Sequence, residues 1–163
     1  MIIGEQMNLH VYGSVNEILS VIEPLRKSGK TLITTNGCFD LLHAGHIKYL
    51  SEAAQLGDML VVGINADETV RKLKGEGRPV QNETDRALIV GSLKMVFGTF
   101  IFHEDDPRAF LSVLKPDIHV KGGDYTKDIL ERETVEQYGG KVEILSFVQG
   151  RSTTSIVSKI RTE

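Results

Sequence analysis

Polar and apolar positions along the chain follow two alternating patterns, one typical of buried strands and one typical of amphipathic helices. Runs of β-branched and other apolar residues at 31–36, 59–64, 100–102, 118–121 and 142–147 predict five short strands. Between these runs, apolar residues recur every three or four positions, which predicts helices. Because strands that alternate with helices build parallel sheets, the pattern predicts an α/β fold: a Rossmann-like doubly wound five-stranded parallel sheet with helices on both faces.

Capping and turn residues indicate where the helices begin and end. Ser14 and Glu17 have the spacing of a capping box and predict a helix that ends at Gly29. Further helices are expected over 46–56, through Val70 and Leu73, from Asn82, from Asp106 (N-cap) and Pro107 (first residue), over 127–138 and from Ile156 to Arg161. Since residues 1–13 show no clear period, we expect a tail and helix over 1–29 and the principal domain over 30–163, within one globular unit.

Composition and charge narrow the class of protein. The 163 residues suit one compact domain, and the net charge of −3 argues against a general nucleic-acid binder or an anionic-membrane binder. The single cysteine, Cys38, allows no internal disulfide and fits a reducing compartment. The sequence has no apolar run long enough to span a membrane and no secretory signal at its N-terminus. We therefore expect a cytoplasmic protein.

The candidate chemistry begins where the first strand of 31–36 passes into a helix. Asn36-Gly37 is a turn signal, and His43 and His46 fall at the helix start, separated by Ala44 and Gly45. The first N–H groups of a helix lack internal partners and carry partial positive charge, so phosphate binds there readily. Two imidazoles on one helical turn can add hydrogen bonds to phosphoryl oxygens, and Gly45 leaves room for a ligand. The pair therefore predicts a phosphate-binding site.

Two later segments have related chemistry. Lys121, Gly122, Gly123 and Asp124 follow the fourth predicted strand, and Ser152-Thr153-Thr154 opens the last helix. A glycine pair is a weak signal and Ser-Thr-Thr alone is usually a helix cap, but together with the histidines they indicate a phosphate-binding crevice. The sequence has neither a Walker A motif nor Gly-x-Gly-x-x-Gly after the first predicted strand, which excludes a P-loop NTPase and a dinucleotide dehydrogenase.

The segment from Asn36 to His46 resembles the signature of the His-x-Gly-His nucleotidylyltransferase superfamily, in its cytidylyltransferase-like branch. Segment 150–154 is similar to the second signature of that branch, and segments 73–79 and 121–125 are similar to those of bacterial D-glycero-β-D-manno-heptose 1-phosphate adenylyltransferases. The resemblance extends from about residue 30 to the C-terminus. It implies the strand order 3-2-1-4-5, with strands 1 and 4 at the topological switch point where ligands bind.

The resemblance also implies a reaction and roles for particular residues. A sugar phosphate oxygen would attack the α-phosphorus of ATP, and pyrophosphate would leave. His43 and His46 would contact the α- and β-phosphates, and Lys74, or alternatively Lys72, would close over them. The remaining nucleotide contacts are expected from Asn36, Gly37, Cys38, Phe39, Gly45, Lys121, Gly122, Asp124, Ser152, Thr153 and Thr154, and the acceptor contacts from Asp40, Lys72, Arg78, Arg86 and Arg151. For Arg86, an exposed or structural ion pair is an equal alternative.

Cofactor, partner and alternatives follow from the same resemblance. Magnesium is expected to bind mainly through the phosphates, with no protein residue predicted as a metal ligand, and the chain is expected to form a homodimer. Asp40 orients either the acceptor or its own loop, whereas Cys38 is expected to be a buried thiol and not a nucleophile. The alternative enzyme is a glycerol-3-phosphate cytidylyltransferase that makes CDP-glycerol. The alternative from another class is a nucleotide-binding sensor or scaffold without turnover.

Overall fold

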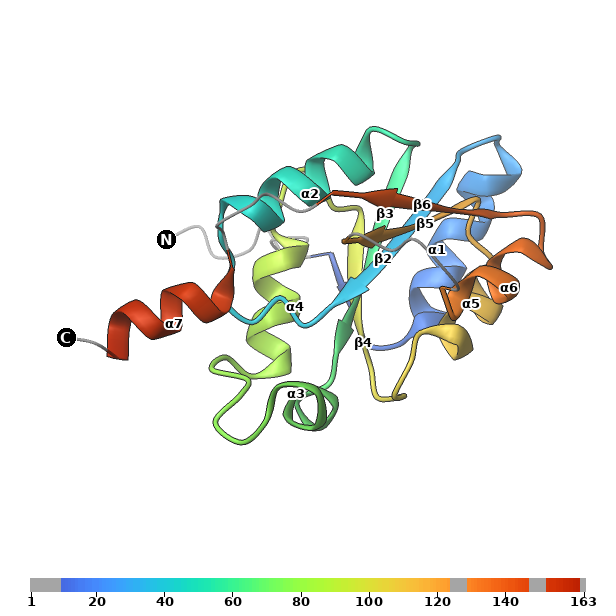
Figure 1. The fold of residues 1–163 in the computed structure, drawn as a ribbon. Helices are drawn as coiled ribbons and strands as arrows, with labels where there is room; N and C mark the ends of the chain where they lie inside the picture. The colour runs from blue at the N-terminus through green and yellow to red at the C-terminus, as the bar shows by residue number, and fades with distance from the viewer. Residues whose placement is uncertain (1–9, 124–128, 147–151, 162–163) are drawn as a thin grey trace, which may run out of the picture.

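A parallel sheet forms the centre of the molecule (Figure 1). The computed structural model describes residues 10–123, 129–146 and 152–161. Within these residues the sheet has six strands, all of them parallel to their neighbours. Their spatial order is β1 (Val11–Tyr12), β4 (Gly98–Phe102), β3 (Met59–Asn65), β2 (Leu32–Gly37), β5 (Ile118–Gly122) and β6 (Lys141–Leu145).

The predicted count of five strands was wrong by one. The five predicted strands are β2 to β6, and they lie in the expected order, but β1 adds a sixth strand beside β4. Val11 pairs with Thr99 and Tyr12 with Phe100. Two residues are too short to show the alternation that identifies a strand, so residues 1–13 gave no signal. Segment 100–102 also extends back to Gly98, where the backbone packs so closely on Tyr12 that a Cβ would lie 2.7 Å from its ring.

Helices cover both faces of the sheet. The two apolar clusters of the core assign α1 (Val15–Lys27), α5 (Arg108–Leu114) and α6 (Glu131–Glu136) to one face, and α2 (Ala44–Ala54) and α4 (Glu83–Gly91) to the other. The short α3 (Asp67–Lys74) follows β3, and α7 (Thr153–Arg161) extends away from the sheet with no buried residue (Figure 1). This arrangement confirms the Rossmann-like α/β class.

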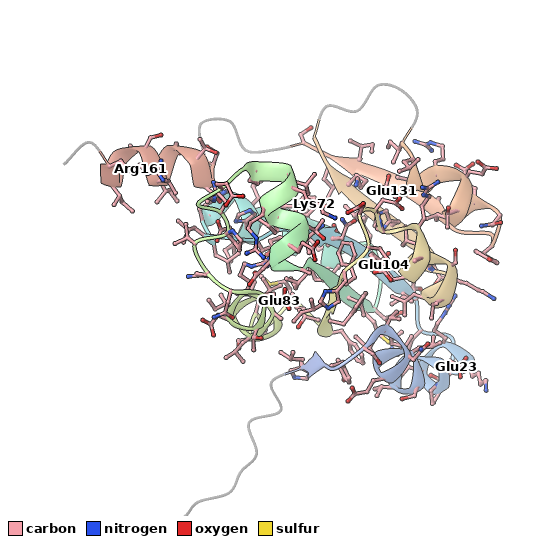
Figure 2. The ribbon with its side chains drawn as sticks, turned by 90° about the horizontal axis from the view of Figure 1, so that it is seen from below. Glu23, Lys72, Glu83, Glu104, Glu131 and Arg161 are labelled. Atoms are coloured by element: carbon pink, nitrogen blue, oxygen red, sulfur yellow. The ribbon has the colours of Figure 1, made fainter. Side chains whose placement is uncertain are left out.

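The core consists of two layers because neighbouring strand residues point to opposite faces. Leu32 packs with α1 and α5, whereas Ile33 packs with α2 and α4. Ile18 and Ile22 of α1 are fully buried in the first layer, so the N-terminal helix shares the core of the sheet. Charged residues such as Glu23 and Arg161 lie on the outside (Figure 2). Within the described residues, no helix is both long and apolar enough to cross a membrane.

Most predicted helix starts are present, with small shifts that have local causes. Ser14 caps α1 by accepting the Glu17 N–H, while the Glu17 carboxylate accepts the N–H of Gly13 and not that of Ser14. The predicted N-cap at Asp106 was off by one residue, since α5 starts at Arg108 and the Asp106 carboxylate pairs with its guanidinium. In the helix expected over 127–138, α6 spans Glu131–Glu136 and positions 127 and 128 lie outside the described residues.

Candidate functional site

A pocket opens at the carboxyl ends of β2 and β5, the two central strands at which the chain switches direction across the sheet. Ligands bind at this position in open α/β sheets. The pocket has a volume of about 480 Å³, which is within the usual range for small-molecule sites. Its lining residues are Asn36, Gly37, Cys38, Phe39, Asp40, His43, Gly45, His46, Tyr49, Lys74, Arg78, Lys121, Gly122, Ser152, Thr153 and Thr154.

The two histidines form a reciprocal cap at the start of α2. His43 is the N-cap residue, and its Nδ1 accepts the N–H of Gly45 at 3.1 Å. In return, Nδ1 of His46 accepts the backbone N–H of His43 at 3.4 Å. Because Nδ1 is an acceptor in both rings, the proton of each neutral imidazole is on Nε2. The sequence pattern His-x-Gly-His thus sets the tautomer of both side chains.

The two rings are also stacked, with centroids 3.9 Å apart and planes inclined by 25°. Burial, together with the nearby His43, lowers the pKa of His46 from 6.5 to about 4. His46 is therefore neutral at pH 7 and can act as a hydrogen-bond donor through Nε2–H.

Phe39 supports His46 from the side of the loop. Its ring is buried, lies 5.3 Å from the His46 ring between centroids, and belongs to a residue in the left-handed region, with φ of 46°. A Cβ on Gly37 would lie 2.9 Å from this ring, so only glycine permits the close approach. The Gly-x-Phe segment before the histidines therefore has a packing function: it fixes the position of the His46 ring.

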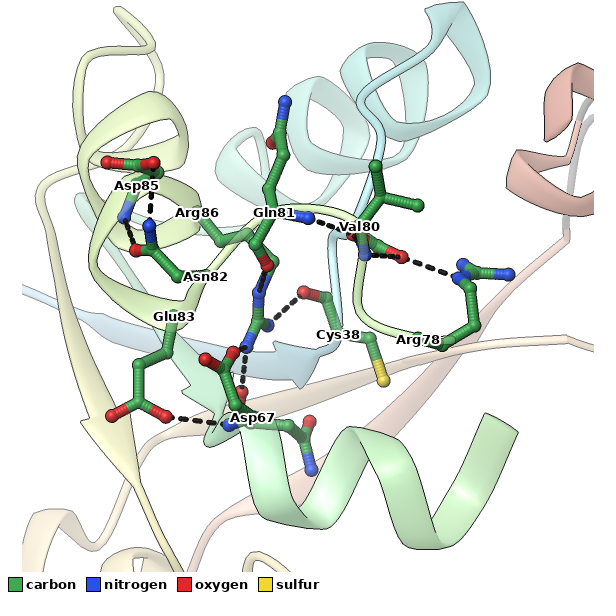
Figure 3. A network of polar contacts seen from close by, with 11 residues as sticks. Cys38, Asp67, Arg78, Val80, Gln81, Asn82, Glu83, Asp85 and Arg86 are labelled. Atoms are coloured by element: carbon green, nitrogen blue, oxygen red, sulfur yellow. Dashed lines mark hydrogen bonds and ion pairs between the residues drawn. The ribbon is translucent and has the colours of Figure 1, made fainter. Parts of the chain in front are cut away.

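Asp40, in the loop after β2, holds the loop after α3 in place by hydrogen bonds. Its buried carboxylate accepts hydrogen bonds from the N–H groups of Val80 and Gln81 at 2.8 and 3.0 Å, and from Nε of Arg78 at 2.6 Å (Figure 3). Burial raises the pKa of Asp40, but these hydrogen bonds outweigh burial and hold the pKa below its usual value. Of the two predicted roles for Asp40, orientation of the loop is the one that these contacts provide.

The two candidate lysines of α3 lie in different places. Lys74, the last residue of the helix, lines the pocket. Lys72 is instead paired with Asp105 at 3.1 Å and Glu68 at 3.7 Å, and it is absent from the pocket wall. Figure 2 shows Lys72 on α3. The structure thus brings Lys74, and not Lys72, to the site.

Cys38 is a half-buried thiol in the pocket wall. Burial raises its pKa, and the nearby charges of Lys74, Arg86 and Arg78 oppose this increase without cancelling it. The thiol is therefore protonated at neutral pH. Lys74, Arg78 and Lys121 give the pocket wall a cationic character, which suits a polyphosphate ligand.

Arg86 does not lie where the sequence placed it. We expected it at the acceptor, but its side chain is fully buried in the first turn of α4 and is not part of the pocket wall. Its guanidinium donates to the carbonyl oxygens of Cys38, Asn65 and Gln81 and pairs with Asp67 (Figure 3). With its donors used in this way, Arg86 is a structural residue beneath the site, which corresponds to the ion-pair alternative and not to the substrate contact.

The segments after β5 and at α7 complete the pocket. Lys121 lines the wall, but its ammonium group pairs at 2.5 Å with Glu131, a nearly buried residue at the start of α6 (Figure 2). Thr153 donates its hydroxyl to the Leu41 carbonyl at 3.1 Å, which joins α7 to the loop before the histidines. The predicted contacts Asp124 and Arg151 lie outside the described residues.

Sequence reasoning missed Tyr49 as a pocket residue. Its hydroxyl lies 2.7 Å from Oγ1 of Thr35 and donates to the Val120 carbonyl at 3.1 Å, so it joins α2 to both central strands. A signal was present, since Tyr49 follows His46 by three residues and falls on the same face of the helix. Among the described residues, no group of three or more His, Cys, Asp or Glu side chains could hold a metal ion.

The fold and the site together define a class: an α/β protein with a cationic pocket and paired histidines at the strand switch point. Comparison with known proteins then gives the family. A model described as Cytidylyltransferase-like matches residues 34–160, and the chain belongs to this family.

Relatives and solved structures agree with this family. The chain is 51% identical over 146 residues to the Bifunctional protein HldE of Pelobacter propionicus, which covers 88% of this chain and 30% of the relative. The HldE protein of Campylobacter fetus is 49% identical over 152 residues, and the match covers 91% of this chain and 32% of that relative. The chain thus spans about a third of the length of these relatives.

A lipopolysaccharide core biosynthesis protein from Thermoplasma volcanium has a similar structure, with a TM-score of 0.63 and 33% identity over 76% of this chain and 100% of that one. A pantoate-beta-alanine ligase from Francisella tularensis has a TM-score of 0.57 at 14% identity, over 94% of this chain and 78% of that one, and shows a likeness of fold alone.

Proposed function

We propose that the chain is an adenylyltransferase that moves AMP from ATP to D-glycero-D-manno-heptose 1-phosphate, giving ADP-heptose and pyrophosphate for surface glycan or lipopolysaccharide synthesis. Three findings support this choice of substrate. The motifs at 73–79 and 121–125 resemble those of heptose-type enzymes. The HldE proteins are about half identical to this chain, and the similar Thermoplasma structure is described as a lipopolysaccharide core biosynthesis protein.

The observation that carries the proposal is the pair of imidazoles at the start of α2. Both have Nδ1 engaged by backbone N–H groups, so both have their proton on Nε2. They lie in the pocket with Lys74 and Arg78, at a helix N-terminus. This combination places neutral donors, cations and the positive end of a helix dipole together, as a polyphosphate requires.

In the proposed reaction, an oxygen of the sugar phosphate attacks the α-phosphorus of ATP. A new P–O bond forms to the sugar phosphate, the bond from the α-phosphorus to the bridging oxygen breaks, and pyrophosphate leaves with that oxygen. Charge accumulates on the oxygens of the five-coordinate phosphorus, and His46 Nε2–H would stabilise it by a preorganised hydrogen bond. Lys74 would neutralise the leaving pyrophosphate, while Ser152 to Thr154 would hold the nucleotide.

Magnesium fits this site only together with the nucleotide. Among the described residues of the pocket wall, the one carboxylate is that of Asp40, and it is already occupied by Arg78 and two backbone N–H groups. The other polar groups that line the pocket are mostly donors, which favour phosphate oxygens over a bare cation. Bound through the phosphates of ATP, magnesium would neutralise the charge of the leaving pyrophosphate.

The test is pyrophosphate release with magnesium in four mixtures: ATP or CTP, each with heptose 1-phosphate or glycerol 3-phosphate. We expect release only with ATP and heptose 1-phosphate. Release with CTP and glycerol 3-phosphate would instead identify a cytidylyltransferase that makes CDP-glycerol. Binding of a nucleotide without release in any mixture would favour a sensor or scaffold.

We also propose a cytoplasmic homodimer. The reducing, ATP-containing cytoplasm suits the substrates and the free thiol of Cys38. Among the described residues, Leu88 and Ile89 on α4 and Ile160 on α7 are exposed to 36%, 37% and 67%, which provides apolar surface for a second copy. Sedimentation equilibrium checks the dimer, and a monomer mass across micromolar concentrations would contradict it.

A further inference from the structure

Arg86 donates hydrogen bonds to three separate chain segments, which are the segments that bring cations and imidazoles to the pocket. The Cys38 carbonyl belongs to the loop that leads to His43, and Nη1 of Arg86 donates to it at 2.5 Å. The Asn65 carbonyl ends β3, two residues before the helix that carries Lys74 at its last position, and Nη2 donates to it at 2.7 Å. The Gln81 carbonyl belongs to the loop of Arg78, and Nε donates to it at 3.0 Å.

The charge of Arg86 is balanced locally. Its Nη2 lies 2.8 Å from the carboxylate of Asp67, the first residue of α3. The N–H of Asp67 in turn donates at 2.6 Å to the Glu83 carboxylate, at the first residue of α4 (Figure 3). α3 has no side-chain cap of its own. These α4 residues contact Asp67 at its start, while the N–H of Ala66 donates to the Phe102 carbonyl at 3.0 Å. A planar fork with five N–H donors is the side chain best suited to bind several carbonyls at once.

We propose that Arg86 is the positioning residue of this site: it sets the mutual placement of the histidines, Lys74 and Arg78 without touching the substrate. This inference rests on the proposed nucleotidyl transfer. If the hydrogen bonds of Arg86 are weakened, substrate still binds in the pocket. The histidines, Lys74 and Arg78, however, no longer have the right geometry for the transition state. The loss therefore falls on kcat and not on KM.

The test compares Arg86→Lys with Arg26→Lys. Lysine keeps the charge but has a single compact ammonium group that cannot reach three carbonyls as the fork does. Arg26 is the matched control, since it also donates to a carbonyl, that of Leu114, and pairs with a carboxylate, that of Asp117, on the α1 side of the sheet. We expect Arg86→Lys to lower kcat by about tenfold or more while the KM for ATP stays within about threefold. Arg26→Lys should leave both constants unchanged.

A second readout is independent of turnover. The loop that Arg86 holds carries Phe39, which packs on the half-buried His46 ring. NMR titration of the ring should therefore show its pKa rise from about 4 toward 6.5 in Arg86→Lys and stay low in Arg26→Lys. A folded Arg86→Lys protein with normal kcat and an unshifted His46 would overturn the proposal. So would a raised KM at unchanged kcat, which is the result for a substrate contact.

Asp67→Asn is the second variant if Arg86→Lys does not fold, because it removes the charge partner of Arg86 and keeps its size. It should lower kcat and raise the His46 pKa, as expected for Arg86→Lys. No shift in either quantity would overturn the proposal. If the unchanged protein releases no pyrophosphate in any mixture, the proposed function fails, while the titration of His46 still decides whether Arg86 positions the histidines.

Discussion

His43 and His46 combine an observed structural role with a proposed chemical one. Each uses Nδ1 to satisfy a backbone N–H group that a helix start would otherwise leave without a partner. This contact fixes the tautomer, so the cap and the proposed phosphate donor are the two nitrogens of one ring. An asparagine or serine could cap the helix equally well. We infer that histidine is present because its second nitrogen extends the donor into the pocket.

Replacement of His46 by alanine tests the chemical part of this role. We expect His46→Ala to lower kcat by about 100-fold or more, as for loss of one preorganised transition-state donor. The protein should remain folded because His46 lies at a loop–helix junction. Steady-state kinetics with circular dichroism provides the measurement, and His103→Ala, at an exposed position outside the pocket wall, is the control. Near-normal kcat in folded His46→Ala would rule out the role.

Lys74 and Lys72 are a matched pair on one helix. Lys74 lines the pocket and Lys72 pairs with Asp105 outside it, so only Lys74→Ala should affect catalysis. We expect Lys74→Ala to reduce kcat/KM by about tenfold or more, through loss of a charge on the transferring phosphates. Lys72→Ala should stay near the activity of the unchanged protein, since its ion pairs are exposed and contribute little. A larger loss of kcat/KM in Lys72→Ala than in Lys74→Ala would assign the phosphate contact to Lys72 instead.

At the scale of elements, two helix N-caps allow an effect on stability to be distinguished from an effect on catalysis. Ser14 caps α1 and Asn82 caps α4, each through a side-chain oxygen that accepts a backbone N–H. Ser14→Ala and Asn82→Ala should each lower the free energy of unfolding by about 1 kcal/mol. Only Asn82→Ala should also lower kcat, because the first turn of α4 contains Arg86. Urea unfolding and kinetics on both variants check this, and equal kinetic effects would contradict it.

The elements that could be predicted from the sequence are those long enough to show a repeating pattern of apolar residues. β2 to β6 and the helix starts at Ser14 and Asn82 follow from local patterns of apolar and capping residues, whereas the helix expected over 46–56 begins two residues earlier, at Ala44. β1 has only two residues and is a strand because β4 is beside it. A local pattern contains no information about such a partner, so this strand could not be predicted.

The same limit applies to the site. His43, His46 and Gly45 could be predicted because they are neighbours in a motif, whereas Lys72 remained an alternative to Lys74 until the end of α3 was known. The role of Arg86 depends on three carbonyls from separate segments, Cys38, Asn65 and Gln81, that only the folded chain brings together. A charged residue in a helix pattern indicates a solvated face, and its full burial is a tertiary property.

The whole molecule should lose stability in mild acid because it holds one buried and one half-buried histidine in the neutral form. Burial lowers the pKa of His119 from 6.5 to about 3 and that of His46 to about 4. Between these values and pH 6.5 the unfolded chain binds protons that the folded protein does not. The free energy of unfolding should therefore be fully present above pH 6.5 and fall as the pH decreases toward 4.

His119 allows this pH dependence to be measured away from the pocket. It is fully buried, and its Nδ1 lies 2.9 Å from Oγ1 of Thr34. In His119→Asn, the amide oxygen can replace Nδ1 in that contact but does not titrate. We expect the urea midpoint of His119→Asn to depend less steeply on pH between 6.5 and 4 than that of the unchanged protein. Equal slopes would show that His119 does not contribute.

The small strand β1 has a consequence for self-association. It pairs with Thr99 and Phe100 of β4, whose sequence Gly-Thr-Phe-Ile-Phe is apolar, rich in β-formers and uncharged. An edge strand of this kind is a template for pairing with other chains, and amyloid segments share its composition. A chain that began at residue 30 would expose this edge and remove Ile18 and Ile22 from the core beneath it. The N-terminal segment therefore protects the sheet from aggregation as well as extending it.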